Sequence, residues 1–240
     1  MSKKRRKQYK RKSNKIWYIG ILIVAIFIAL GLIAFKNREN SEELQLPLDI
    51  PEKMQPISVG QDIEVTNLGK YTGAYMEDGS DEVVEDVLMA IVKNNGQNTL
   101  QYAELYMNYG ESTAEFSLST LPPGESVVIL EKNRMSSKSE EPDFVYLENV
   151  VFFQEEISMH EDLFEITSSD GILNIKNISS EDITGDIFIY YKNFSVDKYY
   201  GGITYRARVE NGLAKDELKQ VAAMHYSSNG SKLLMVTYNE

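Results

Sequence analysis

Hydrophobic and polar residues follow two different patterns along this chain. The first is a single block, Ile16 to Phe35, in which twenty consecutive residues carry no charge, no proline and no strongly polar side chain. As a helix this block is roughly 30 Å long, the thickness of the hydrocarbon core of a bilayer. The second pattern begins at Ile57, where short apolar runs alternate with polar turns. The sequence therefore predicts one transmembrane helix, residues 16–35, and a separate folded part.

The residues beside the apolar block predict its orientation. Residues 1–15 contain nine Lys or Arg and no acidic residue, and basic segments beside a span tend to stay in the cytoplasm. Trp17 and Tyr18 fit the aromatic belt at a membrane interface, so we expect them to act as interface anchors. The basic tail either sets the topology alone or also binds anionic lipid headgroups. We expect a single-pass cell-membrane protein with a cytoplasmic N-terminus and its C-terminal domains outside.

A cleaved signal peptide is the alternative interpretation of the block. The apolar core of a signal peptide spans about 7 to 15 residues and precedes a small-x-small cleavage site. Here twenty apolar residues end in Ala34-Phe35-Lys36 without an Ala-x-Ala pattern, which favours an uncleaved signal anchor. Ala25 and Ala29 form a small-xxx-small pair, which either seats a partner helix, as in a homo-oligomer, or faces lipid.

Beyond the span, the pattern changes from a linker to strands. Residues 36–56 contain three prolines and little periodicity, which predicts a semi-extended stalk. The following runs are rich in Val, Ile, Tyr, Phe and Thr and are separated by Gly, Asn, Asp or Ser clusters, which is typical of successive β-strands. The clearest predicted strands are Val83 to Lys93, Leu100 to Tyr109, Ala114 to Ser119, Ser126 to Glu131 and Phe144 to Phe153.

Strict alternation in Leu100 to Tyr109 separates a core face from a mixed face. The core face holds Ala103, Leu105, Met107 and Tyr109, and the mixed face holds Tyr102, Glu104, Tyr106 and Asn108. We therefore expect this strand to lie on one side of a hydrophobic core.

The strand pattern also repeats along the chain. Residues 91–109 and 174–194 each contain a strand ending in Lys-Asn, a polar turn and a longer alternating strand. A second match relates residues 121–130 to 213–223, and each of these is followed by a polar loop and a last apolar strand. Two tandem copies of one β-module are the economical interpretation.

The repeat divides the folded part at residue 158. We predict an all-β ectodomain of two tandem antiparallel β-sandwiches, module 1 at residues 57–157 and module 2 at 158–240. Residues 213–226 also have the Ala, Leu, Lys and Glu content of a short helix, but the repeat favours a strand there.

Several short motifs resemble a known family. They are Val92-Lys93-Asn94-Asn95, Leu100-x-x-Ala103, Tyr109-Gly110 and Leu121-Pro-Pro-Gly124-Glu125, and the second copy keeps Ile175-Lys176-Asn177 and Ile183. These motifs resemble FxLYD-type domains and similar immunoglobulin-like modules of membrane-anchored bacterial proteins. The second copy lacks the Pro-Gly turn at residues 213–216. The resemblance implies a non-enzymatic extracytoplasmic module, with no catalytic residues to carry over.

Charge and cysteine content narrow the classes of function. All 36 acidic residues lie beyond the apolar block with 16 of the 25 basic ones, so that part has a net charge of −20. Nucleic acid is therefore not an expected partner, because its binding requires Lys and Arg to neutralise phosphates. The chain has no cysteine, which excludes disulfides, thiolate metal sites and cysteine nucleophiles, so an apolar core must hold the fold.

Candidate catalytic chemistry is sparse. The histidines are His160 and His225, and an arrangement of His225 with Ser227 and Asp216 lacks a Gly-x-Ser-x-Gly elbow. Adjacent acidic pairs are abundant, but neighbours on a strand point to opposite faces, so they indicate a solvated surface rather than a glycosidase site. The acidic stretch 77–82 offers oxygens for Ca²⁺ but lacks EF-hand spacing, so we favour an acidic turn. Phosphate-binding glycine motifs are absent, and we predict no catalytic, cofactor or metal residues.

Aromatic residues provide the remaining candidate surface. Tyr102 and Tyr106, with Phe188 and Tyr190 in the second copy, occupy the strand face opposite the apolar one. An exposed aromatic row on a sheet binds a peptide, a glycan or a protein, unless another part of the protein covers it. We therefore take these four residues as the candidate binding surface.

These patterns favour a non-catalytic binding or assembly module, an accessory subunit that presents a β-sandwich surface to a protein partner at or near the membrane. A free sheet edge would also accept a partner strand. Two alternatives stay open: an extracytoplasmic hydrolase acting on cell-surface polymer, and a sensor ectodomain that works through a separate signalling partner.

Overall fold

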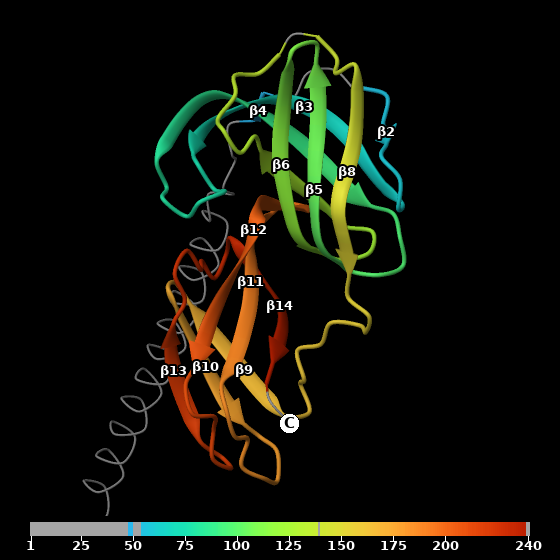
Figure 1. The fold of residues 1–240 in the computed structure, drawn as a ribbon. Helices are drawn as coiled ribbons and strands as arrows, with labels where there is room; N and C mark the ends of the chain where they lie inside the picture. The colour runs from blue at the N-terminus through green and yellow to red at the C-terminus, as the bar shows by residue number, and fades with distance from the viewer. Residues whose placement is uncertain (1–47, 50–53, 139, 239–240) are drawn as a thin grey trace, which may run out of the picture. The chain divides into compact units, whose positions relative to one another are not determined.

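The computed structural model describes residues 48–49, 54–138 and 140–238, and every helix or strand in these ranges is a β-strand (Figure 1). The strands are β1 (Leu48–Asp49), β2 (Ile57–Ser58), β3 (Ile63–Ala74), β4 (Val83–Asn94), β5 (Leu100–Tyr109), β6 (Ser112–Leu121), β7 (Ser126–Leu130), β8 (Phe144–Phe152), β9 (Phe164–Ser169), β10 (Ile172–Asn177), β11 (Ile187–Ser195), β12 (Lys198–Val209), β13 (Leu218–Ala222) and β14 (Ser231–Thr237). The all-β class is confirmed, and the five clearest predicted strands correspond to β4 to β8.

The structure bears in different ways on the predicted transmembrane helix, the predicted stalk and the segment 213–226. The basic tail and the predicted transmembrane helix, residues 1–35, lie outside the described residues. Within residues 54–138 and 140–238 no helix has the length and apolar character needed to cross a membrane. The predicted stalk contains β1, which pairs antiparallel with β3. In the segment 213–226, where a helix was the alternative, the regular element is strand β13.

The strands form three sheets. The largest has the order β1-β3-β4-β7-β12-β11-β14, with β2 also paired to β3. The other two have the orders β6-β5-β8 and β13-β10-β9. Nearly all neighbours are antiparallel, but β7 and β12 pair in parallel, with Tyr199 opposite Val127 and Tyr200 opposite Val128. The expectation of purely antiparallel sheets is wrong at this point, because the largest sheet contains strands from both halves of the chain.

Strand pairing repeats between the first half of the described chain, β1 to β8, and the second half, β9 to β14. In the first half β4 lies between β3 and β7, and β5 lies between β6 and β8. In the second half β10 lies between β9 and β13, and β11 lies between β12 and β14. The order of the strands along the chain is the same in both halves, which agrees with the repeat in the sequence.

The motif Lys-Asn ends β4 and β10 because its asparagine ties three segments together. Asn94 is fully buried and donates from Nδ2 to the carbonyls of Leu121 and Asn98, both at 2.9 Å. Asn177 is also fully buried and donates from Nδ2 to the carbonyls of Leu213 and Glu181, at 3.1 and 2.8 Å. A buried amide is tolerated only when it is hydrogen-bonded in this way. The repeated asparagine therefore fixes the same turn in each half.

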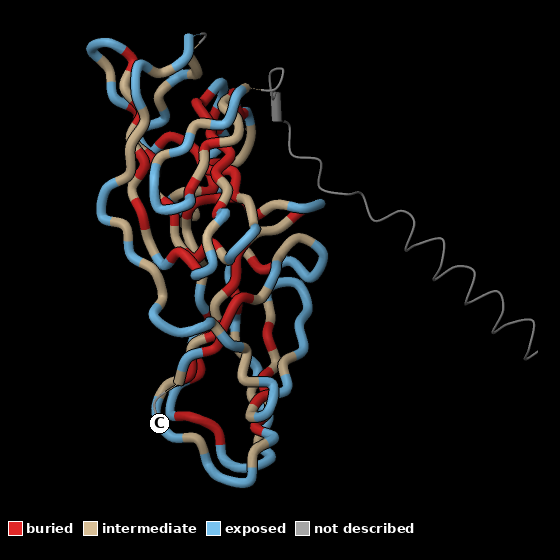
Figure 2. The backbone as a smooth tube through the Cα atoms, turned by 90° about the vertical axis from the view of Figure 1, so that its right-hand side faces the viewer, coloured by how far each residue is buried: buried red, intermediate tan, exposed pale blue. Residues whose placement is uncertain are grey.

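Two hydrophobic clusters lie mainly one in each half (Figure 2), although Tyr199 and Leu234 of the second half also belong to the first cluster. The first cluster includes Leu88, Ala103, Leu105, Met107, Phe116 and Ile129. The second includes Leu173, Ile175, Ile187, Ile189, Ala207 and Val236. Burial of such side chains contributes about 1.5–3 kcal/mol each relative to exposure, so these clusters are the main source of stability in a chain without disulfides.

A third cluster covers the other face of β4 and β7. It includes Met89, Ile91, Val128 and Tyr75 from the first half and Tyr200 from β12. Strand β4 is therefore buried on both faces, which is why its residues 87–92 are apolar without alternation. Because Tyr200 packs into this cluster beside the parallel β7–β12 pair, apolar contact as well as hydrogen bonding joins the two halves.

Candidate protein-binding face

The candidate surface is the outward side of the sheet β6-β5-β8, visible as three adjacent strands in Figure 1. On β5, the inward Ala103, Leu105 and Met107 are fully buried, as the alternation predicted. The outward Tyr102 and Tyr106 are half-buried. The strand thus positions both tyrosines on the side away from the core.

Strand β8 extends this aromatic surface. Tyr146 lies directly opposite Tyr106 in the antiparallel register, and their rings stack with centroids 5.3 Å apart. Phe144 stacks on Tyr146 at 5.9 Å, and its residue surface is 58% exposed. Val151, opposite Tyr102, is 47% exposed. We call this surface, made of Tyr102, Tyr106, Phe144, Tyr146 and Val151, the aromatic face.

One carboxylate fixes two of the three tyrosines of the aromatic face, Tyr102 and Tyr106. Tyr102 donates its hydroxyl to Glu104 Oε1 at 2.9 Å, and Tyr106 donates to Glu104 Oε2 at 3.2 Å. Asn149 Nδ2 also donates to Oε2, at 2.6 Å. These hydrogen bonds lower the pKa of Glu104, that from Asn149 most strongly. Because the hydroxyls are anchored, the rings lose little conformational freedom when a partner binds.

The electrostatic environment of the aromatic face is negative. Strands β5, β6 and β8 contain Glu104, Glu115 and Glu148 and no Lys or Arg. The pKa of Tyr106 is raised, first by desolvation and then by these three carboxylates. Each of the glutamates therefore acts on the central tyrosine. The positive charge of Lys132 makes a smaller contribution to the lowered pKa of Glu104.

The other two predicted residues lie on a different sheet. Phe188 and Tyr190 belong to β11 and are half-buried on the face opposite the second core. The guanidinium of Arg206, from β12, lies 5.0 Å from the ring centre of Phe188. Phe188 and Tyr190 therefore lie on a separate sheet from Tyr102 and Tyr106, because β5 and β11 are in different sheets. Trp17 and Tyr18 lie outside the described residues.

Sequence reasoning missed Phe144 and Tyr146, which complete the aromatic face. A signal was present: β8 had been predicted as a strand, and in it Phe144, Tyr146 and Glu148 alternate with Val145 and Leu147. What the alternation does not give is the partner strand and the register, and it is the register that places Tyr146 opposite Tyr106.

Both histidines occupy packed surroundings. His225 stacks on Tyr205 with ring centres 5.0 Å apart, and its Nδ1 is 3.2 Å from Asp81 Oδ2. Its nearest acidic partner is thus Asp81, rather than the Asp216 considered from the sequence. The ring of His160 meets that of Tyr238 edge-on at 5.1 Å. Each histidine ring therefore packs against a tyrosine ring.

The acidic stretch 77–82 is organised as a turn. Asp78 accepts a hydrogen bond from the Ser80 amide at 2.9 Å, and Arg134 forms ion pairs with Asp78 and Glu82 at 3.2 and 2.7 Å. The carboxylate of Glu77 points inward to backbone amides. Within the part of the chain that the structure describes, no group of three or more His, Asp or Glu is arranged to hold a metal ion.

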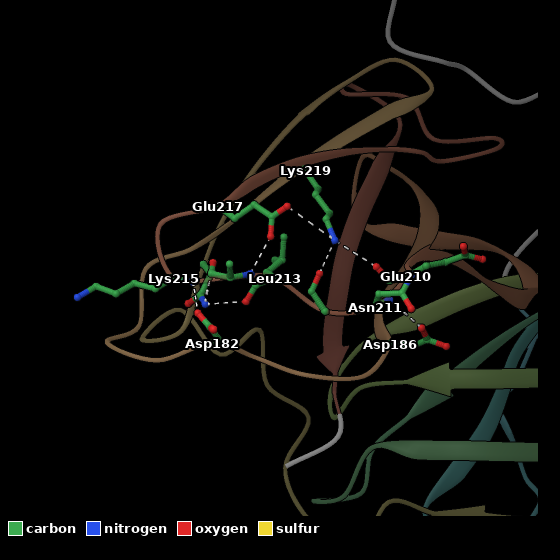
Figure 3. Close-up of polar contacts among 11 residues, drawn as sticks. Asp182, Asp186, Glu210, Asn211, Leu213, Lys215, Glu217 and Lys219 are labelled. Atoms are coloured by element: carbon green, nitrogen blue, oxygen red, sulfur yellow. Dashed lines mark hydrogen bonds and ion pairs between the residues drawn. The ribbon is translucent and has the colours of Figure 1, made fainter.

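Charged residues at the turns of the second half also bind backbone groups (Figure 3). Lys219 Nζ donates to the carbonyls of Gly212 and Glu210, at 2.7 and 3.2 Å. Glu217 accepts from the Ala214 amide at 2.7 Å, and Asp182 accepts from the Lys215 amide at 2.8 Å. These side chains stabilise the turns of the second half.

Comparison of the chain with family models, with curated proteins and with solved structures found no match in any of the three.

Proposed function

We propose that this chain is a non-catalytic, membrane-anchored extracytoplasmic subunit, which presents a β-sheet surface to a protein partner. In this proposal Ile16 to Phe35 is the uncleaved anchor in the cell membrane. The two halves of the described chain are tandem immunoglobulin-like β-sandwiches outside it. The repeated pairing of β4 with β3 and β7, and of β10 with β9 and β13, supports the tandem arrangement.

The observation that carries the proposal is the aromatic face. Tyr106, Tyr146 and Phe144 stack in a continuous row, and Glu104 anchors the hydroxyl of Tyr106. Fixed aromatic side chains are enriched at protein interfaces, because they bury a large area at low entropic cost. A row of this kind on the side away from the core has no role in holding the sheet to its hydrophobic cluster. We infer that this aromatic row serves to bind a partner.

The contacts of the acidic residues support a binding module over a hydrolase. Glycosidase chemistry needs two carboxyl groups facing each other across a substrate. Instead, Arg208 binds Asp186 at 2.6 Å, Arg134 binds Glu82 at 2.7 Å, and Glu104 accepts hydrogen bonds from side chains of its own sheet. These carboxylates already have structural partners.

Crosslinking in source cells, followed by purification of the full-length chain, tests the proposal. The test variant is Tyr106→Ala/Tyr146→Ala, and the matched control is Phe188→Ala/Tyr190→Ala, which removes two outward aromatic side chains from β11. We expect a partner to co-purify with the wild type and the control but not with the test variant. Equal recovery of the partner with all three proteins would contradict the proposal.

A further inference from the structure

The two halves of the chain treat outward aromatic rings differently. In the second half a basic residue lies over such a ring: the guanidinium of Arg206 is 5.0 Å from the ring centre of Phe188. In the first half, strands β5, β6 and β8 contain no Lys or Arg at all. The corresponding sheet of the repeat therefore carries aromatic rings and carboxylates without basic residues of its own.

The chemistry of the aromatic face matches a cation. The stacked rings of Tyr106 and Tyr146 offer π-faces that attract an ammonium or guanidinium group. Glu115 lies directly opposite Tyr106 on β6, and Glu148 lies two residues from Tyr146 on β8, so both strands beside β5 contribute a carboxylate. A guanidinium satisfies both features at once, because it stacks on aromatic rings and binds carboxylates through a planar fork of N–H donors.

We propose that the aromatic face binds an Arg- or Lys-bearing segment of its protein partner, with the cationic side chains stacked on the tyrosine rings and paired with Glu115 and Glu148. This inference rests on the proposed function, because it names the chemistry of the partner for the same face. A second copy of the chain is a poor occupant, since the part beyond residue 35 has a net charge of −20 and like faces repel.

The test uses the full-length chain in nanodiscs of neutral phosphatidylcholine, since anionic lipid would bind a cationic probe. The probe is a fluorescent Arg-Gly-Ser repeat peptide, and its binding is measured by anisotropy. The test variant is Glu115→Gln/Glu148→Gln. The matched control, Glu161→Gln/Glu165→Gln, removes the same charge from the second half. We expect the test variant to bind about fivefold or more weakly and the control to stay within about twofold of the wild type.

Equal weakening by the two double variants would overturn the proposal, because the peptide would then respond only to total negative charge. Absence of wild-type binding would overturn it too. A third variant, Tyr106→Leu, keeps every carboxylate and separates ring stacking from charge. We expect it to weaken binding of the Arg peptide by about threefold or more, and unchanged affinity would contradict the stacked geometry.

The same peptide distinguishes failure of this inference from failure of the proposed function. If the partner recovered from cells depends on Tyr106 and Tyr146, and an excess of Arg peptide displaces it, both stand. If recovery depends on those tyrosines but the peptide does not displace the partner, the proposed function stands and the cationic segment is refuted. If recovery does not depend on those tyrosines, the proposed function fails for this face.

Discussion

Glu77 and Lys192 hold the backbone of Gly202 between them. The Gly202 amide donates to Glu77 Oε2 at 2.7 Å, and Lys192 Nζ donates to the Gly202 carbonyl at 3.2 Å. Glu77 Oε1 also accepts from the Leu130 amide at 2.8 Å, and Lys192 donates to the Ser119 carbonyl at 2.7 Å. These bonds tie β12 to β6 and β7. Two charged side chains therefore fasten the second half of the chain to the first.

Both charged groups are enclosed by protein. Lys192 is fully buried, and although the Glu77 residue is partly exposed, its carboxylate lies in the interior. Burial raises the pKa of Glu77 to about 7 and lowers the pKa of Lys192 to about 7. The opposite charge of each group moderates the shift of the other. The hydrogen bonds to Gly202, Leu130 and Ser119 offset the cost of desolvation.

Removing either charged group should destabilise the protein. Glu77→Leu leaves the amides of Leu130 and Gly202 without their acceptor and removes the charge that opposes that of Lys192. We expect this variant to lower the free energy of unfolding by about 2–5 kcal/mol, and Lys192→Met to lower it by a similar amount. The double variant should lose at least about 1 kcal/mol less than the sum, because neither charge is then stranded. Denaturant unfolding of the full-length chain, followed by near-UV circular dichroism, measures these values. Simple additivity would contradict the coupling.

Stability should depend on pH through the same pair. Because the pKa of Glu77 is raised from 4.5 to about 7, its contribution is fully present below pH 4.5 and is lost as the pH rises through 7. Because the pKa of Lys192 is lowered from 10.5 to about 7, its contribution is absent below pH 7 and grows above it. The difference in unfolding free energy between the wild type and Glu77→Leu/Lys192→Met should thus pass through a minimum near pH 7.

Unfolding series of both proteins between pH 5 and 9 measure this difference. Carboxylates whose pKa is lowered, such as Asp186 and Glu104, are present in both proteins. Their contributions to the pH dependence therefore cancel in the difference. A difference that rises steadily from pH 5 to 7 has the wrong sign for a buried Glu77 with a raised pKa. That result would contradict the proposed contribution of Glu77 to stability.

Gly202 should not tolerate a side chain. A Cβ atom at this position would lie 1.8 Å from the Ser117 carbonyl oxygen of β6, so Gly202→Ala requires the two strands to separate. We expect a loss of about 3 kcal/mol or more, as for other overpacked sites. Gly230→Ala is the matched control, because the nearest atom to its Cβ is the Ser227 side chain at 3.6 Å. Thermal unfolding compares the two, and equal melting temperatures would argue against a close β6–β12 contact.

The two buried asparagines should be equally sensitive. Asn94→Ala and Asn177→Ala each leave buried carbonyl and amide groups without partners, and we expect each to cost about 2–4 kcal/mol. Asn174→Ala, three residues before Asn177 on β10 and only half-buried, should cost less than about 1 kcal/mol. Unfolding in urea measures all three. A small effect at only one of Asn94 and Asn177 would contradict equivalent turns in the two halves.

Local pattern predicted much of this fold. The alternation in Leu100 to Tyr109 gave both the strand and its inward face, because period-two burial is a property of each strand alone. The Lys-Asn repeat also located the corresponding turns, because a buried asparagine is needed wherever the chain makes that turn. These signals are short-range and can be read from neighbouring residues.

The rest depends on contacts between distant residues. Glu77 and Lys192 look like ordinary surface charges in the sequence, and only the packing of β12 on β6 and β7 encloses them. Likewise, alternation gives the outward face of β11 but not its sheet, so the sequence does not show how far Phe188 and Tyr190 lie from the tyrosines of β5. The parallel pair β7–β12 joins two strands that are far apart in the sequence, and no residue pattern in their turns predicts this pairing.

Site-specific photocrosslinking in source cells tests the central claim, that the aromatic face contacts a protein partner. A photoreactive phenylalanine analogue replaces Tyr146 in one variant of the full-length chain and Tyr190 in the other. The account predicts one discrete heavier adduct from position 146 and none of that mass from position 190. No adduct from position 146, or the same adduct from both positions, would contradict it.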